Sequence, residues 1–156
     1  MPEESSKFNL NLKKGGAPGP EFKTCVQRSI ANTKLMADEL AKLGYKVIPG
    51  SINNCIVIVD MTDKELTGKE TEIVLERCGI LASRSTIPND PNPPVNPSGV
   101  RFGTAAITIR GVKEEEIKKI VVWINSAIEH KDEIEILESI KDEVKKMCLE
   151  FPIPSI

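Results

Sequence analysis

The chain has 156 residues, which suits one domain or one domain with a tail. Its formal net charge is −2 and aromatic residues make up only 4% of it, so we expect no surface that binds nucleic acid or anionic membrane. No apolar run approaches the length of a membrane span, and the first residues lack the apolar core of a secretory signal.

The four cysteines are widely spaced and form no C-x-x-C pair, which argues against disulfides and against a zinc site. They are Cys25, Cys55, Cys78 and Cys148. Each stands in an apolar or helical context, so we expect buried, reduced thiols in a cytoplasmic protein. The single histidine, His130, stands near the end of a predicted helix, so we expect neither a metal site nor a histidine-based triad.

Residues 1–19 are predicted to form a flexible tail, because Gly15–Pro20 has the composition of a loop. The domain proper is then predicted over residues 20–156. A long amphipathic helix is expected to begin at Pro20 and to end at Gly44. Its apolar positions fall mostly on one face: Phe22, Val26, Ile30, Met36, Ala37, Leu40 and Leu43.

Two strands are predicted to follow this helix. Lys46–Ile48 is a candidate short strand, and Pro49–Asn54 is expected to turn the chain. The β-branched run Cys55–Asp60 is most simply a buried strand.

A short helix is predicted over Lys69–Cys78. Thr67 and Glu70 have the spacing of a capping box before it, and Gly79 is suited to end it. Ile80–Ala82 is a candidate short strand.

A long loop rich in proline comes next, and its restricted backbone angles favour a shaped loop over a flexible one. The prolines are Pro88, Pro91, Pro93, Pro94 and Pro97. Thr104–Ile109 alternates enough to be a half-buried strand. Two amphipathic helices, Glu114–His130 and Asp132–Glu150, complete the chain. This order predicts an α+β fold: a short, largely antiparallel sheet with helices packed on one side.

Arg101 is the strongest candidate for a residue that binds a ligand. Its guanidinium is a planar fork of donors that matches a carboxylate, and Gly99 and Gly103 would let the backbone approach a ligand closely. Arg110 would lie at the far end of the predicted strand. On composition alone, two surface arginines paired with acids are the favoured alternative. Ser98 has no obvious base partner, so we do not expect it to act as a nucleophile.

Six segments of the chain carry specific motifs. The most specific is SGVRFGTAAITIRG (Ser98–Gly111). The others are PEFKT (Pro20–Thr24), GYKV (Gly44–Val47), the strand ending in Val59–Asp60, LTGKETE (Leu66–Glu72) and STIPND (Ser85–Asp90). In their order along the chain they resemble the C-terminal small domain of serine hydroxymethyltransferase, in which the most specific segment has the pattern S-G-[IVL]-R-x-G-T-[PA]-A-[ILV]-T-x-R-G.

The resemblance implies a pyridoxal-phosphate enzyme of fold type I that moves a one-carbon unit between serine and tetrahydrofolate. Arg101 matches the arginine that binds the carboxylate of the amino-acid substrate, and Arg110 and Ser98 would support that site. Ser85 and Val95 fall in the loop that approaches folate in the family. At these positions the chain departs from the common pattern, which puts the folate contact in doubt more than the amino-acid contact.

The resemblance runs from about Pro20 to the carboxyl end, so residues 1–19 are either a flexible tail or a segment foreign to the family, and it covers only the family's small domain. The family's lysine that forms the Schiff base lies in an upstream T-H-K-T segment that this chain lacks, as it lacks the large domain's cofactor-binding residues. We therefore expect the chain to be inactive alone and to bind no cofactor by itself. It would need a large domain, within an enzyme expected to be a homo-oligomer. The alternative is a non-catalytic relic that binds a partner chain.

Overall fold

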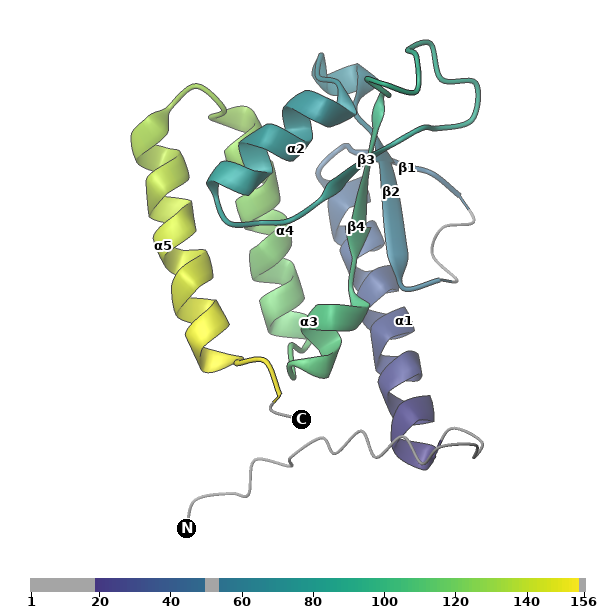
Figure 1. Cartoon of the computed structure of the whole chain (residues 1–156), viewed down its shortest axis with the longest axis vertical. Coiled ribbons are helices and arrows are strands. Elements are labelled where there is room, and N and C mark those ends of the chain that lie inside the picture. The colour runs from purple at the N-terminus through teal and green to yellow at the C-terminus, as the bar shows by residue number, and fades with distance from the viewer. Residues whose placement is uncertain (1–18, 50–53, 155–156) are drawn as a thin grey trace.

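A four-stranded antiparallel sheet in the order β1-β2-β4-β3 forms one layer of the computed structural model, which describes residues 19–49 and 54–154 (Figure 1). The strands are β1 (Lys46–Val47), β2 (Ile56–Asp60), β3 (Ser83–Ser85) and β4 (Gly99–Gly103). The central pair is β2 and β4, and Arg101 on β4 stands opposite Ile58 on β2 and Ser83 on β3.

Helices form the second layer, and α4 lies between α1 and α5 (Figure 1). Their bounds are α1 (Pro20–Lys42), the 3-10 turn η1 (Thr62–Lys64), α2 (Gly68–Arg77), α3 (Ala105–Ile109), α4 (Glu114–Glu129) and α5 (Ile134–Glu150). Within the described residues, no helix combines the length and the apolar character that crossing a bilayer requires.

The two faces of the sheet differ sharply in burial. Alternate residues point to the helices and form the core with them: Val57, Val59, Val100 and Phe102 are each 5% exposed or less. The residues between them point the other way. There Ile58 is half-buried, and Arg101 and Ser83 are exposed. We call this second surface the open face. The predicted α+β fold, with its helices on one side of the sheet, is confirmed.

Three of the described helices end in the same way, with a glycine just beyond the last turn. Gly44, Gly79 and Gly111 have φ angles of 82°, 76° and 97°, a region that glycine enters at little cost. In each case the N–H of the next residue donates to the carbonyl five residues earlier. These bonds run from Tyr45 to Leu40, from Ile80 to Leu75 and from Val112 to Ile107, at 3.0–3.1 Å. The predicted ends at Gly44 and Gly79 are confirmed.

The strand predicted over Thr104–Ile109 is wrong, because Ala105–Ile109 is the helix α3. The strand is the preceding Gly99–Gly103, so Arg101 lies in its middle and Arg110 is not on it. The strand predicted over Ile80–Ala82 is also misplaced, and the edge strand is Ser83–Ser85. Ile80 instead completes the turn that ends α2.

The other expectations have mixed outcomes. The capping box of α2 is confirmed, with Thr67 and Glu70 bonded in both directions. All four cysteines are free. Cys25 and Cys78 are buried as expected, but Cys55 is only half-buried and Cys148 is exposed, so the prediction of buried thiols is wrong for Cys148. The predicted tail, apart from its last residue, and most of the turn at Pro49–Asn54 lie outside the described residues.

A buried polar seam joins α1 to α3. Asn32 donates its amide N–H to the Thr108 hydroxyl at 3.0 Å and to the Val112 carbonyl at 3.2 Å. The hydroxyls of Thr33 and Thr104 lie 2.6 Å apart, and Thr104 also donates to the carbonyl of Ser29. Since buried polar groups are costly unless they are paired, these bonds fix how the two helices meet.

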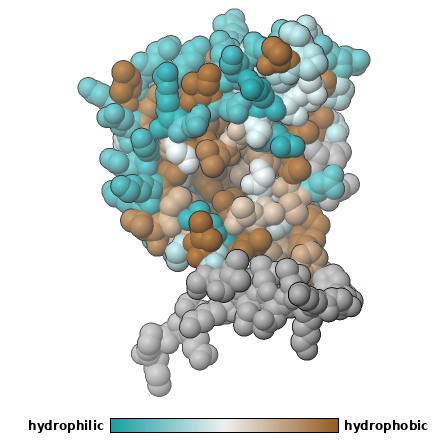
Figure 2. Space-filling view, in the orientation of Figure 1, coloured by the Kyte–Doolittle hydropathy of each residue, from teal (hydrophilic) through white to brown (hydrophobic). Residues whose placement is uncertain are grey.

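A largely apolar hollow of about 300 Å³ opens on the helical side of the molecule, and Figure 2 shows apolar side chains gathered around it. Its lining includes Phe102, Ile107, Ile120, Trp123, Met147 and Phe151. Among the described residues, no lysine lines it.

Candidate functional site

The side chain of Arg101 is exposed in the middle of the open face. Its guanidinium forms no hydrogen bond or ion pair with another described residue. Because β4 is paired on both edges, by β2 and by β3, the backbone of Arg101 is firmly placed. The result is a cation on a fixed backbone, with donors free among the described residues, which suits bidentate binding of a carboxylate.

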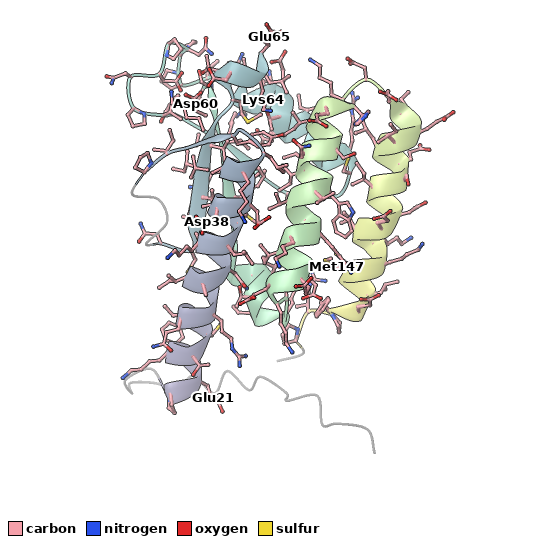
Figure 3. All side chains as sticks on the ribbon, turned by 180° about the vertical axis from the view of Figure 1, so that it is seen from behind. Glu21, Asp38, Asp60, Lys64, Glu65 and Met147 are labelled. Atoms are coloured by element: carbon pink, nitrogen blue, oxygen red, sulfur yellow. The ribbon has the colours of Figure 1, made fainter. Side chains whose placement is uncertain are left out.

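Asp60 closes one end of the open face, where β2 runs into the turn that carries Lys64 (Figure 3). Its Oδ2 lies 3.1 Å from Nζ of Lys46 on β1, and its Oδ1 accepts bonds from the N–H and the hydroxyl of Thr62. Burial would raise the pKa of Asp60, but the bonds from Thr62 and Lys46 outweigh burial and lower it. Lys46 thus has an acidic partner in Asp60, whereas Arg101 has none among the described residues.

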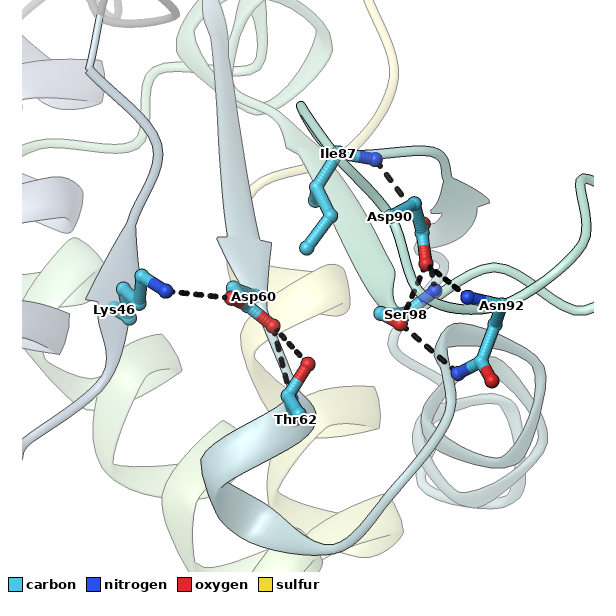
Figure 4. A network of polar contacts seen from close by, with 7 residues as sticks. All are labelled: Lys46, Asp60, Thr62, Ile87, Asp90, Asn92 and Ser98. Atoms are coloured by element: carbon cyan, nitrogen blue, oxygen red, sulfur yellow. Dashed lines mark hydrogen bonds and ion pairs between the residues drawn. The ribbon is translucent and has the colours of Figure 1, made fainter.

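The proline-rich loop over residues 86–98 borders the same face and is organised by one carboxylate, that of Asp90 (Figure 4). Its Oδ1 accepts bonds from the Asn92 N–H at 2.9 Å and the Ser98 hydroxyl at 2.7 Å. Its Oδ2 accepts bonds from the N–H groups of Ile87 at 3.2 Å and Ser98 at 3.0 Å. Asp90 thus ties the entry of the loop to its exit. Asp90 is not among the site residues predicted from sequence, although aspartate followed by proline is typical of turns.

Burial would raise the pKa of Asp90, but the four hydrogen bonds outweigh it and lower the pKa to about 2. A carboxyl whose pKa is lowered on folding stabilises the fold when ionised. That contribution is complete above about pH 4, and is lost as the pH falls toward 2.

We therefore expect Asp90→Asn to be about 1–3 kcal/mol less stable than the wild type at neutral pH, because two of the four groups that donate to Asp90 lose their acceptor. The deficit should narrow between pH 4 and pH 2. Urea unfolding across this pH range measures it. Asp142→Asn, an exposed change on α5, is the control and should match the wild type throughout. A deficit of Asp90→Asn that stays constant with pH would contradict the assignment.

Two glycines, Gly68 and Gly99, lie where the loop meets the sheet. Because they have no side chain, the backbone of neighbouring segments can approach them closely. A Cβ at Gly99 would lie 2.5 Å from the Ser85 carbonyl oxygen and 2.6 Å from Cγ2 of Ile87. A Cβ at Gly68, the first residue of α2, would overlap the Gly99 carbonyl oxygen. Gly68 also donates its N–H to the Pro97 carbonyl at 2.7 Å. The backbones of α2, the loop and β4 are therefore in direct contact at Gly99, two residues before Arg101.

The other predicted site residues fall in three different settings. Ser98 is 1% exposed, its hydroxyl donates to Asp90 and accepts from Asn92, and the low pKa of Asp90 makes this carboxylate a weak base, so the hydroxyl serves the loop. Ser85 stands on β3 opposite Gly99, and Val95 is 76% exposed on the loop. The structure thus brings Ser98, Ser85 and Val95 into or beside one loop.

Arg110 belongs elsewhere. Its Nε donates to the carbonyl of Phe151 at 2.6 Å and its Nη2 to that of Cys148 at 2.9 Å. A cation on these carbonyls completes the C-terminal end of α5, where the helix dipole favours positive charge. Arg110 is therefore engaged in holding α5 and α3 together.

The described residues contain no cluster of histidine, cysteine or carboxylate side chains suited to hold a metal ion.

Comparison with known proteins shows the family to which the chain belongs. The family model described as serine hydroxymethyltransferase matches residues 9–124, which is most of the chain. Two relatives, serine hydroxymethyltransferases from Buchnera aphidicola subsp. Acyrthosiphon pisum strains 5A and APS, are each 40% identical over 134 residues. That alignment covers 86% of this chain and 32% of each relative, so the chain spans about a third of their length. With its motifs in order, its small α+β fold and this match, the chain belongs to the serine hydroxymethyltransferase family.

Proposed function

We propose that residues 20–156 act as the small domain of a serine hydroxymethyltransferase and supply Arg101 to bind the carboxylate of serine or glycine. One observation carries this proposal: Arg101 stands exposed on the open face, with its donors unused among the described residues. A guanidinium of this kind binds a carboxylate through two parallel hydrogen bonds and so fixes the orientation of the amino acid.

The composition of the open face also supports the proposal that a second domain packs against it. Ile56 and Ile58 on β2 leave apolar surface there, which no described helix covers. The matched relatives are about three times as long as the aligned segment. We propose that the remaining two thirds form the large domain and cover this face, in an enzyme that is a homo-oligomer.

Pyridoxal phosphate, the cofactor that the family implies, does not fit the described residues of this chain. The apolar hollow has no lysine among the described residues of its lining. The open groove between α4 and α5 has Lys118, Lys119 and Lys146, but four glutamates line it too, and they would repel an anionic phosphate. We therefore propose that the cofactor is held by the large domain.

The remaining roles follow from position. Ser85 and Val95 border the open face from the side of the loop, where we propose that tetrahydrofolate approaches. Ser98 supports the loop and Arg110 supports α5, so neither is proposed to touch the substrate. The free cysteines fit a reducing compartment, and we propose a cytoplasmic location.

The experiment that tests the proposal is a hybrid enzyme. Residues 20–156 replace the matching third of the Buchnera aphidicola relative from strain 5A, and cleavage of serine with tetrahydrofolate is measured. Turnover is expected. A folded hybrid that binds pyridoxal phosphate but does not bind serine would favour the alternative, a relic that kept the fold without the substrate site.

The chain alone is expected to bind neither cofactor nor amino acid. Calorimetry with glycine should give no binding heat, because Arg101 offers one contact and the others belong to the large domain. Mixing with pyridoxal phosphate followed by borohydride should label no single lysine selectively. Selective labelling of one lysine would show that the chain has a cofactor site of its own.

A further inference from the structure

The loop over residues 86–98 has an internal organisation that the carboxylate-binding role of Arg101 does not require. Arg101 is already fixed by its pairing with β2 and β3. The loop is fixed separately, by the four bonds that Asp90 accepts from Ile87, Asn92 and Ser98 (Figure 4). Strand pairing therefore positions Arg101, and the hydrogen bonds of Asp90 position the neighbouring loop.

Asp90 is the centre of the hydrogen-bond network that fixes the loop. Three of its donors are backbone N–H groups, and five prolines in this loop have no N–H to offer for alternative pairings. Ser98 extends the network, since its hydroxyl also accepts a bond from the Asn92 amide at 2.9 Å. Its carbonyl accepts the Met61 N–H at 3.0 Å, which anchors the loop exit to the end of β2.

Contact between the loop and the sheet depends on the same carboxylate. Asp90 Oδ2 holds the N–H of Ile87, and the Ile87 side chain lies against Gly99, where a Cβ would be 2.6 Å from its Cγ2. Ser85, two residues before Ile87, pairs with Gly99 across the strands. When the carboxylate is lost, Ile87 at the start of the loop is no longer tied through Asp90 to Ser98 at its end.

We propose that Asp90 is the positioning residue of the loop over residues 86–98, and that through this loop it sets the binding of the folate co-substrate while leaving the amino-acid site of Arg101 unchanged. The second half of this inference rests on the proposed function. The low pKa of Asp90 agrees with it, because the hydrogen bonds that lower this pKa are the bonds that hold the loop.

The first test uses the 156-residue chain and amide hydrogen exchange. In Asp90→Asn the side chain keeps one acceptor oxygen, so at least two of its four bonds are lost. Depending on which side the amide oxygen faces, either the amides of Ile87 and Ser98 or the amide of Asn92 should exchange at least about tenfold faster than in the wild type, while those of Val100 and Phe102 in β4 keep their protection. Asp142→Asn is the matched control and should change none of them. Unchanged protection at all three loop amides would overturn the proposal.

The second test uses the hybrid enzyme and separates positioning from general damage. Asp90→Asn should raise the KM for tetrahydrofolate by about tenfold or more, with the KM for serine changed less than about threefold. Equal changes in both KM values, or none in that for tetrahydrofolate, would overturn the folate half.

Asp90→Glu checks for chemical rescue. Its longer carboxylate can still accept the bonds, so part of the amide protection and of the tetrahydrofolate KM should return. An inactive wild-type hybrid would count against the proposed function, whereas the exchange experiment would still decide whether Asp90 positions the loop.

Discussion

Arg101→Ala in the hybrid enzyme is expected to weaken serine binding by about 2–5 kcal/mol, a loss of roughly 30-fold or more in affinity. The substrate carboxylate would then be left in a closed site without its cationic partner. The same substitution in the 156-residue chain should change the free energy of unfolding by less than about 0.5 kcal/mol, because the side chain is exposed and unpaired among the described residues.

Two variants make this test specific. Arg101→Lys keeps the charge but loses the planar fork, so an intermediate loss of serine affinity is expected. Arg84→Ala is the matched control. Arg84 lies on neighbouring β3, and its Nε lies 3.6 Å from Oε2 of Glu72 on α2. Serine affinity should stay within about twofold of the wild type. Serine binding that survives in Arg101→Ala would remove Arg101 from the substrate site.

Gly68→Ala is expected to destabilise the chain by about 3 kcal/mol or more, although it adds only a single methyl group. The added Cβ would overlap the Gly99 carbonyl oxygen and lie 3.0 Å from that of Pro97. Both are backbone atoms of the rigid junction between loop and strand, so no side chain can rotate away. Alanine normally stabilises a helix relative to glycine, and here the close contact reverses the sign.

Urea unfolding of matched glycine variants measures the effect. Gly99→Ala should also be strongly destabilised, because its Cβ would lie 2.5 Å from the Ser85 carbonyl oxygen. Gly103→Ala on the same strand is the control. Its Cβ would meet nothing closer than the Cys55 carbonyl oxygen at 4.0 Å, so a change below about 1 kcal/mol is expected. Similar effects at Gly68 and Gly103 would show that flexibility, and not space, governs these positions.

The long helices and the buried strand β2 could be predicted because each carries a strong local signal. Thr67 and Glu70 mark the start of α2, and Gly44 and Gly79 mark helix ends that the structure places within a residue or two. Arg101 stood out because it is flanked by glycines and because its segment resembles a family motif.

The helix α3 was missed because its residues favour a strand. Threonine and isoleucine dominate Thr104–Ile109, and β-branched residues are enriched in sheets. A correct signal was nevertheless present. Gly111 followed by Val112 repeats the pattern of glycine and then an apolar or aromatic residue seen at Gly44 and Gly79. Read as a third helix end, it would have placed the strand before Thr104.

The edge strand β3 and the role of Asp90 could not be predicted in the same way. Ser83–Ser85 is polar and only three residues long, so it carries no alternation, and it forms because β4 offers a free edge. The partners of Asp90 lie up to eight residues away along the chain. Which of them meet depends on the path of the loop, which the positions of the prolines restrict without determining.

The polar seam between α1 and α3 also connects α1 to the strand that carries Arg101. Hydrogen bonds are directional, so α1 cannot slide or rotate against α3 without breaking the bonds of Asn32 and Thr104. Thr104 follows directly on the last residue of β4, only three residues beyond Arg101. Helix α1, which spans 23 residues, is therefore bonded through Ser29 and Thr33 to the residue that directly follows the strand of Arg101. Any displacement of this helix that keeps these bonds would also displace the end of β4.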